Sequence, residues 1–144
     1  MQGGHVPSAR RITDRDYARL LSVRTRLRRF ERWSAEQAAA QGLTASQHQL
    51  LLAVRGHDEP AGPTIGQVAD YLMVRHNTAV ELVDRTQDLG LLDRTRDATD
   101  HRIVRLTLTD EGLARLAALA GSHIEELSRL GPMVDGVTAA LSQD

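Results

Sequence analysis

Residues 64–112 read TIGQVADYLMVRHNTAVELVDRTQDLGLLDRTRDATDHRIVRLTLTDEG, and this stretch decides the fold. It holds two short segments with the apolar spacing of helices, followed by two strand-like runs joined by a polar tip. These segments are residues 64–72, 75–88, 91–96 and 103–108. Thr64 suits the N-cap of the first helix, and Gly90 suits the C-terminal cap of the second. Two short helices followed by a charged two-stranded hairpin predict a winged helix-turn-helix.

A long helix is predicted before this stretch. Nothing breaks a helix between Asp14 and Gln41, and apolar residues recur there at three- and four-residue steps. Thr13 with Asp16 three residues later is typical of an N-cap, and Gly42 ends the run where a left-handed cap is needed. A helix of about 28 residues is about 40 Å long. Such a helix in a small protein usually packs against another chain or a long partner helix.

Three more helices are expected around the central stretch. Thr44 is the expected cap of a helix between the long helix and residue 64. Thr109 caps a helix that starts with two acids on the positive end of its dipole. The Gly131-Pro132 pair is expected to break that helix, and a short last helix follows it. Its apolar positions would be Met133, Val134, Val137 and Leu141.

Composition limits the function classes. The 144 residues suit one domain and contain no cysteine, which excludes disulfides, thiolate metal sites and thiol-based redox sensing. There is no 18-residue apolar run and no secretory signal, so we expect no membrane span and a cytoplasmic location. All 18 basic residues are arginines. Arginine suits phosphate binding, but a GC-rich genome would produce the same bias.

The start of the helix over residues 75–88 carries side chains suited to reading DNA. These are Arg75, His76, Asn77 and Thr78. Arginine pairs with guanine and asparagine with adenine, while threonine can meet phosphate or a thymine methyl group. The alternative is an ordinary polar helix start capped by Asn77 or Thr78, but the position between a short helix and a hairpin favours DNA contact. Glu81 counts against it, because an acid repels phosphate, although it could accept a hydrogen bond from a cytosine amine.

The predicted hairpin is rich in arginine. It offers Arg94, Arg96, Arg102 and Arg105. Arg102 lies beside the tip and could enter a narrow minor groove, while Arg96 and His101 are further candidates for DNA contact. The alternative is a surface hairpin whose arginines pair internally with aspartates. Both can hold at once, because an aspartate can fix the angle of an arginine.

Neither a catalytic centre nor a metal site is predicted. The sequence has no GxSxG motif, no phosphate-binding glycine loop and no tight pair of carboxylates, so we expect no enzyme and no cofactor. The histidines lack HxxxH or HExxH spacing. His48 and His123, on the second and fifth predicted helices, could still meet in a pocket.

The chain resembles the MarR family of bacterial winged-helix transcription factors from about residue 14 to 130. Residues 100–112, DHRIVRLTLTDEG, look like the family wing pattern D-x-R, three residues, L-x-L-T-x-x-G. Residues 76–85, HNTAVELVDR, followed by residues 89–92, LGLL, are similar to the family recognition helix. Thr86 departs from the pattern, which has an apolar residue at this position.

This resemblance implies a fold that is mainly α with a small β-hairpin wing, and N- and C-terminal dimerisation helices. The parts would be a disordered tail, a dimerisation helix, a winged-helix lobe that binds DNA, and C-terminal dimerisation helices. Their boundaries are residues 1–12, 13–42, 43–108 and 109–144. The resemblance further implies a homodimer that binds a near-palindromic operator in double-stranded DNA. Asn77 and Thr78 would face bases, and Arg102 would sit at the wing tip.

The usual role in this family is repression that is relieved by a small, often aromatic or anionic, effector. A pocket near the dimer interface, lined by residues such as Trp33, His48 or His123, would receive it. Two alternatives stay open. The charge-neutral stretch 72–105 is compatible with a ligand- or protein-binding dimer of weak DNA affinity. The histidines are compatible with a regulator that responds to a metal.

Overall fold

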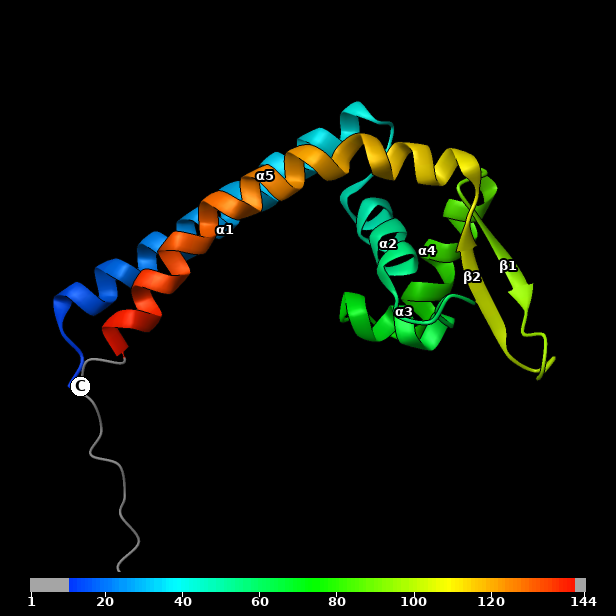
Figure 1. The fold of residues 1–144 in the computed structure, drawn as a ribbon, viewed down its shortest axis with the longest axis horizontal. Helices are drawn as coiled ribbons and strands as arrows, with labels where there is room; N and C mark the ends of the chain where they lie inside the picture. The colour runs from blue at the N-terminus through cyan, green and yellow to red at the C-terminus, as the bar shows by residue number, and fades with distance from the viewer. Residues whose placement is uncertain (1–10, 142–144) are drawn as a thin grey trace, which may run out of the picture.

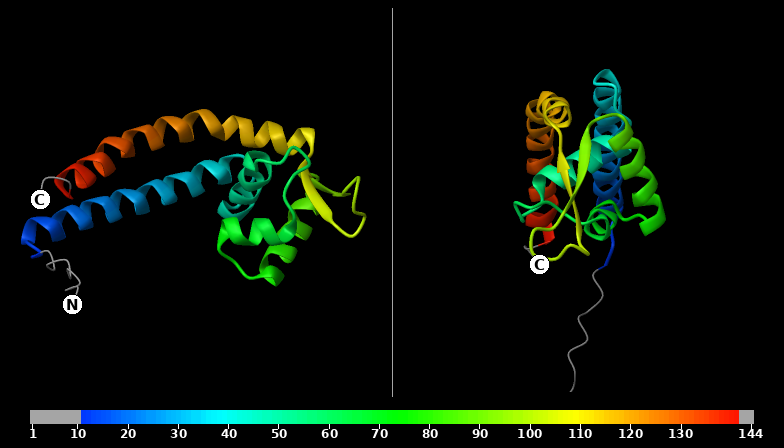
Figure 2. Two further views of the ribbon diagram at one scale, coloured as in Figure 1. Left: turned by 60° about the horizontal axis from the view of Figure 1, so that its bottom comes forward. Right: turned by 90° about the vertical axis from the view of Figure 1, so that its right-hand side faces the viewer.

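The computed structural model describes residues 11–141, and its elements form a long stem and a compact lobe (Figure 1). The stem consists of α1 (Asp14–Ala40) and α5 (Asp110–Leu141), which run side by side (Figure 2). The lobe contains α2, α3, α4 and the antiparallel strands β1 and β2. Their bounds are Ala45–Gly56, Ile65–Leu72, His76–Asp88, Leu92–Arg96 and Val104–Leu108. This mainly helical fold with a hairpin wing confirms the predicted fold class. The expected disordered tail, residues 1–12, lies almost wholly outside the described residues.

Three helices begin at threonines that form complete capping boxes. Thr13, Thr44 and Thr64 accept hydrogen bonds from the backbone N–H three residues on, and the side chain at that third position accepts from the threonine N–H in return. The boxes satisfy N–H groups that a helix start leaves without a partner. Gly42 and Gly90 follow their helices with φ of 74° and 75°, the left-handed conformation expected from the sequence.

Two clusters of buried side chains hold the parts together. The first ties the stem to the lobe and consists of Ala38, Leu43, Leu51, Leu91, Leu116 and Leu119. The second fills the lobe and consists of Leu50, Val54, Val68, Val83, Leu92 and Leu106. Thr86 is fully buried on the inner face of α4, and its hydroxyl donates to the Leu82 carbonyl at 2.7 Å. This internal bond explains how a hydroxyl occupies a position where the family pattern has an apolar residue.

The predicted break at Gly131-Pro132 is wrong. The last helix α5 continues through Pro132 to Leu141, so there is one C-terminal helix rather than two (Figure 1). Proline removes one backbone hydrogen bond and crowds the carbonyl four residues earlier, which bends a helix without having to end it. The residue before a proline normally resists the helical conformation because its Cβ meets the proline ring. Gly131 has no Cβ, so this obstacle is reduced. No helix of the described part is long and apolar enough to cross a membrane.

Candidate nucleic-acid interface

The first turn of α4 presents four side chains without internal partners. Arg75 is the N-cap residue and makes no side-chain cap bond, which removes the alternative that Asn77 or Thr78 caps this helix. All four predicted residues of this turn are exposed. They are Arg75, His76, Asn77 and Thr78. Within residues 11–141, no hydrogen bond or ion pair engages their side chains, so they are free to meet a ligand.

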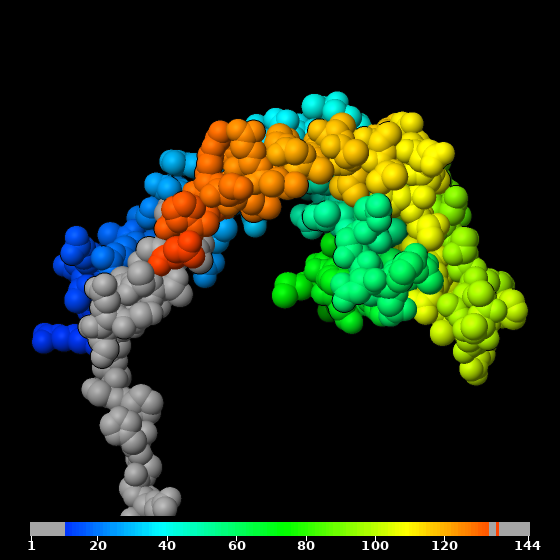
Figure 3. All heavy atoms as spheres, viewed as in Figure 1, coloured from blue at the N-terminus to red at the C-terminus, as the bar shows by residue number. Residues whose placement is uncertain are grey.

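The direction of α4 follows from how its far end is fixed. The Thr109 hydroxyl, at the start of α5, donates to the Gly90 carbonyl just after α4 at 2.6 Å. The C-terminal end of α4 therefore lies near the start of α5, and the first turn of α4 lies about 20 Å away from that point. The hairpin leaves the same junction and extends to the same side (Figure 1). Figure 3 shows the lobe and the hairpin projecting together from one end of the stem, below its arch.

The hairpin tip is organised by Asp97. Its carboxylate accepts from the Thr99 hydroxyl at 2.8 Å, from the Thr99 and Asp100 N–H groups, and from Nε of Arg105 at 2.9 Å. The Thr99 hydroxyl, followed by Arg105, holds the pKa of Asp97 far below its ordinary value. Arg96 donates to the His101 carbonyl at 3.0 Å, which closes the loop from the other side. These hydrogen bonds give the tip a fixed shape.

Arg102 points away from this fixed tip into solvent. Its side chain is 90% exposed and pairs in a fork with Asp100, with Nε to Oδ1 at 3.1 Å and Nη2 to Oδ2 at 3.0 Å. This pair lowers the pKa of Asp100 and raises that of Arg102. Asp100 therefore orients a guanidinium that keeps most of its surface open. His101 beside it is also exposed.

Two of the four hairpin arginines form bonds that stabilise the fold and, unlike Arg102, do not point into solvent. Arg105 is only 14% exposed and binds Asp97, Glu59 at 3.1 Å and the Gly62 carbonyl at 3.1 Å. Arg94 reaches across from β1 to α4, where it binds Asp84 at 2.5 Å and Gln87. Both arginines follow the predicted alternative, in which hairpin arginines pair internally with aspartates. Arg94 thereby fixes the angle between the hairpin and α4, which sequence spacing alone did not reveal.

A groove runs between α4 and the start of α2. Its volume is about 350 Å³, and α4 contributes Thr78, Glu81, Leu82 and Arg85 to its wall. The residues that line it from other segments are Thr44, Ser46, Gln47, Gln49, Leu72 and Val74. The α2 residues were not predicted for this site, because they lie about 30 residues earlier in the chain and carry no motif.

The three predicted ligand residues lie in one ring cluster where α1, α2 and α5 meet. The ring centroids of His48 and His123 are 4.7 Å apart, and those of Trp33 and His123 are 4.8 Å apart. Nδ1–H of His123 donates to the Leu119 carbonyl at 2.8 Å, so its Nε2 accepts from the Ser34 hydroxyl at 2.7 Å. Burial lowers the pKa of His48, and His123 lowers it further.

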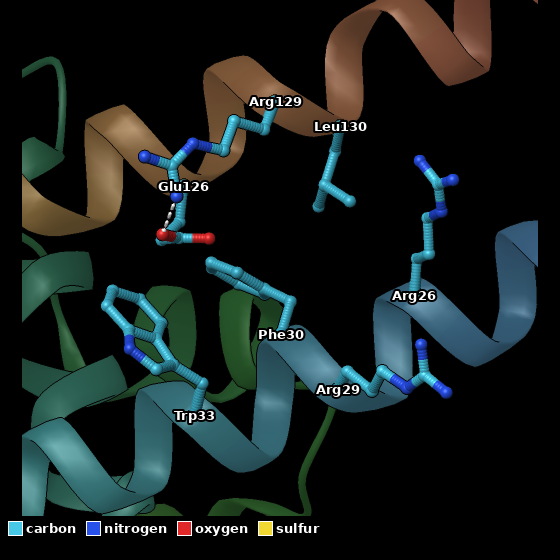
Figure 4. A pocket seen from close by; sticks show the side chains of 7 residues that line it. All are labelled: Arg26, Arg29, Phe30, Trp33, Glu126, Arg129 and Leu130. Carbon is cyan, nitrogen blue, oxygen red and sulfur yellow. Dashed lines mark hydrogen bonds and ion pairs between the residues drawn. The ribbon is translucent and has the colours of Figure 1, made fainter.

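Next to this cluster, a cavity of about 290 Å³ opens between α1 and α5 (Figure 4). Trp33 lines it, whereas His48 and His123 do not. Its other lining residues, which the sequence did not suggest, are Arg26, Arg29, Phe30, Glu126, Arg129 and Leu130. Arg129 is paired with Glu125 and Glu126 of its own helix. Among the residues described, no group of three side chains has the arrangement of a metal site.

Comparison with known proteins agrees with this geometry. Residues 41–103, which include α2, α3, α4, β1 and the hairpin tip, match the MarR family. The HTH-type transcriptional regulator PecS of Dickeya dadantii (strain 3937) is 30% identical over 83 residues, which are 58% of this chain and 50% of PecS. The HTH-type transcriptional repressor MdtR of Bacillus subtilis (strain 168) is 26% identical over 92 residues, 64% of this chain and 57% of MdtR. The match therefore spans about half the length of these curated relatives.

Solved structures extend the likeness to nearly the whole chain. The complex of MepR from S. aureus with DNA aligns with 92% of this chain and 96% of the MepR chain, with a TM-score of 0.66 at 20% identity. At this identity the likeness concerns the fold. Residues 41–103 therefore match the MarR family by sequence, and nearly the whole chain shares the winged-helix fold of the solved structures.

Proposed function

We propose that this protein is a dimeric transcriptional regulator that binds DNA through α4 and the hairpin, and that it acts as a repressor. The observation that carries the proposal is the joint exposure of the first turn of α4 and of Arg102 on one side of the lobe. Neither the four residues of that turn nor the outer face of Arg102 is used by the fold. The name of the relative MdtR, a repressor, and the DNA-bound structure of MepR support the same role.

In this proposal α4 enters the major groove and the hairpin lies over the adjacent minor groove. Asn77 reads a base edge, because an amide can pair with both N6 and N7 of adenine. Arg75, His76 and Thr78 contact neighbouring bases or phosphates, and Arg102 enters the minor groove. Arg96 and His101 contribute at the edge of the hairpin. Phosphate contacts would supply much of the affinity and base contacts the discrimination.

A second copy of the chain would cover the apolar residues that the stem leaves in solvent. On α1 and α5, large apolar side chains such as Leu21 and Ile124 are 66% and 67% exposed. Further exposed residues of this kind are Tyr17, Leu20, Leu27, Leu113 and Leu127. Many large apolar side chains exposed on two neighbouring helices favour an interface. A symmetric dimer would present two copies of α4, which suits a near-palindromic operator with half-sites about one helical turn apart.

The test measures binding of the purified protein to the DNA upstream of its own gene. Fluorescence anisotropy at several salt concentrations gives the affinity and its salt dependence. Arg102→Ala should weaken binding to all sequences and reduce the slope of log K against log salt by about 0.9 per lost phosphate contact. Asn77→Ala should instead cost about 1–3 kcal/mol at one base step and leave the salt slope unchanged. An unchanged affinity and slope for Arg102→Ala would refute the role of the wing.

The cavity between α1 and α5 is the proposed effector site. It joins two aromatic rings, Phe30 and Trp33, to the guanidinium groups of Arg26 and Arg29, which have no ion pair within the part of the chain that is described. Stacking surfaces beside free cations suit a planar aromatic ring that carries an acidic group. Occupation of the cavity would alter how α1 and α5 pack and hence the spacing of the two lobes.

Trp33 is the only tryptophan of the chain, so its fluorescence reports directly on this cavity. Benzoic acid derivatives should change that fluorescence and weaken DNA binding, whereas benzyl alcohol should do neither. The double variant with Arg26→Gln and Arg29→Gln should lose the response. Arg32→Gln is the matched control, because Arg32 lies on the same helix and, within the described structure, pairs with Glu36 in solvent and does not line the cavity. A response that persists in the double variant would exclude this site.

A dimer that binds ligands or proteins with little DNA affinity is the second candidate. It is favoured by the acids on the outer face of α4, which include Glu81 and Asp88. A DNA gel-shift experiment distinguishes the two candidate functions. Failure of the wild-type protein to retard any DNA, at low salt and without effector, would select the second candidate.

A further inference from the structure

The outer face of α4 carries a carboxylate where a recognition helix meets DNA. Glu81 is exposed and lies one helical turn beyond Asn77 on the same face of α4. It also lines the groove between α4 and α2, next to Thr78. Its position on the helix is therefore directly beside the two residues proposed to face bases.

Glu81 differs from the neighbouring acid Asp84 in having no partner. Asp84 is held by Arg94 at 2.5 Å, as part of the link between α4 and β1. Glu81 makes no hydrogen bond or ion pair within residues 11–141. The α2 residues across the groove, Ser46 and Gln47, are uncharged. Arg85, one turn further along α4, lines the same groove but forms no ion pair with Glu81 in the described structure. The carboxylate thus keeps both oxygens available to accept hydrogen bonds.

A carboxylate can only accept hydrogen bonds, and this limits what it can face in DNA. Phosphate oxygens and the acceptors of guanine and thymine repel it. The major groove offers donors only at N4 of cytosine and N6 of adenine, and adenine places the acceptor N7 beside its donor. Cytosine is therefore the base that a carboxylate on a recognition helix prefers.

We propose that Glu81 is a specificity-determining residue, which selects cytosine at the base step next to the one that Asn77 reads. The inference rests on the proposed DNA binding through α4. It assigns the negative charge of this helix a role: Glu81 lowers affinity for DNA in general and rejects half-sites that lack the cytosine. The groove around it leaves the side chain room to reach a base edge.

The test is selection of binding sites from a random DNA library by the full-length protein, with wild type, Glu81→Gln and Asp88→Asn in parallel. Asp88 is the matched control, because it is an exposed acid on the same helix face two turns further from the first turn of α4. Wild type and Asp88→Asn should enrich sites with cytosine at one symmetric position of each half-site. Glu81→Gln should change the preference there toward adenine, with a change in relative affinity of about 5- to 100-fold and no change at other positions.

The outcomes distinguish failure of the role of Glu81 from failure of the proposed DNA-binding function. Identical enriched sites for wild type and Glu81→Gln would overturn the role of Glu81 while leaving DNA recognition by the protein intact. Equal loosening at every position would also overturn it, because a general charge effect would then explain the result. If wild type enriches no sequence, the proposed function fails, and the role of Glu81 fails with it. Circular dichroism of each variant checks that the exposed substitutions leave the fold unchanged.

Discussion

Gly112, the third residue of α5, should not tolerate a single added carbon atom. A Cβ built at this position would lie 2.0 Å from the carbonyl oxygen of Leu91 and 2.9 Å from its carbonyl carbon. Ordinary van der Waals contacts of a Cβ begin near 3.4 Å. Both sides of the clash are backbone, and Leu91 is fully buried in the cluster that joins the stem to the lobe. No side-chain rotation can therefore relieve it.

The change in the free energy of unfolding that we expect for Gly112→Ala has two opposing contributions. Replacing glycine by alanine inside a helix normally stabilises by about 0.5–1 kcal/mol. Overpacking of a closely packed site costs about 1–3 kcal/mol or more, and a backbone obstacle favours the upper end of that range. Gly112→Ala should therefore lower the free energy of unfolding by about 2 kcal/mol. The start of α5 would have to move away from the junction that also fixes the end of α4, so DNA affinity should fall as well.

Urea unfolding followed by circular dichroism at fixed protein concentration measures the effect. Gly121→Ala is the matched control, since Gly121 lies in the same helix and its Cβ would have no atom within 4 Å. That control should be stabilised by up to about 1 kcal/mol. A Gly112→Ala protein as stable as wild type would refute the argument from close approach.

Three further predictions follow from buried or shared polar groups. Thr86→Val replaces a buried hydroxyl that bonds only within its own helix, so the free energy of unfolding should stay within about 1 kcal/mol of wild type; a larger loss in urea unfolding would contradict this. Arg94→Ala should change the free energy of unfolding by no more than about 1 kcal/mol, because Asp84 is half exposed. The same substitution should reduce DNA affinity in anisotropy measurements, because it frees the hairpin from α4. Equal affinity would show that the link between Arg94 and Asp84 is dispensable. The pKa of His48 is lowered by burial and by His123, so the unfolded chain takes up this proton first as the pH falls below about 6.5. The free energy of unfolding should keep its full value above that pH and decrease below it. His48→Gln should reduce this decrease, whereas His101→Gln, at an exposed position, should not.

The sequence alone determined the local elements of this protein. Thr13, Thr44 and Thr64 predicted helix starts, and Gly42 and Gly90 predicted helix ends, because a cap depends on residues only two or three positions away. The alternation of residues 103–108 predicted the second strand for the same reason. The candidate residues at the start of α4 were also visible, since they depend on the order of helix, helix and hairpin.

The tertiary structure decided which arginines are free and which helices continue. Arg94 and Arg105 are used by partners such as Gln87, Asp97 and Glu59, and nothing in the spacing of the hairpin distinguishes them from Arg102. The cavity between α1 and α5 joins residues about 100 positions apart. The physical reason is the same throughout: a cap or turn is settled within one turn of chain, whereas a long-range pair exists only after packing has fixed the distance between two elements.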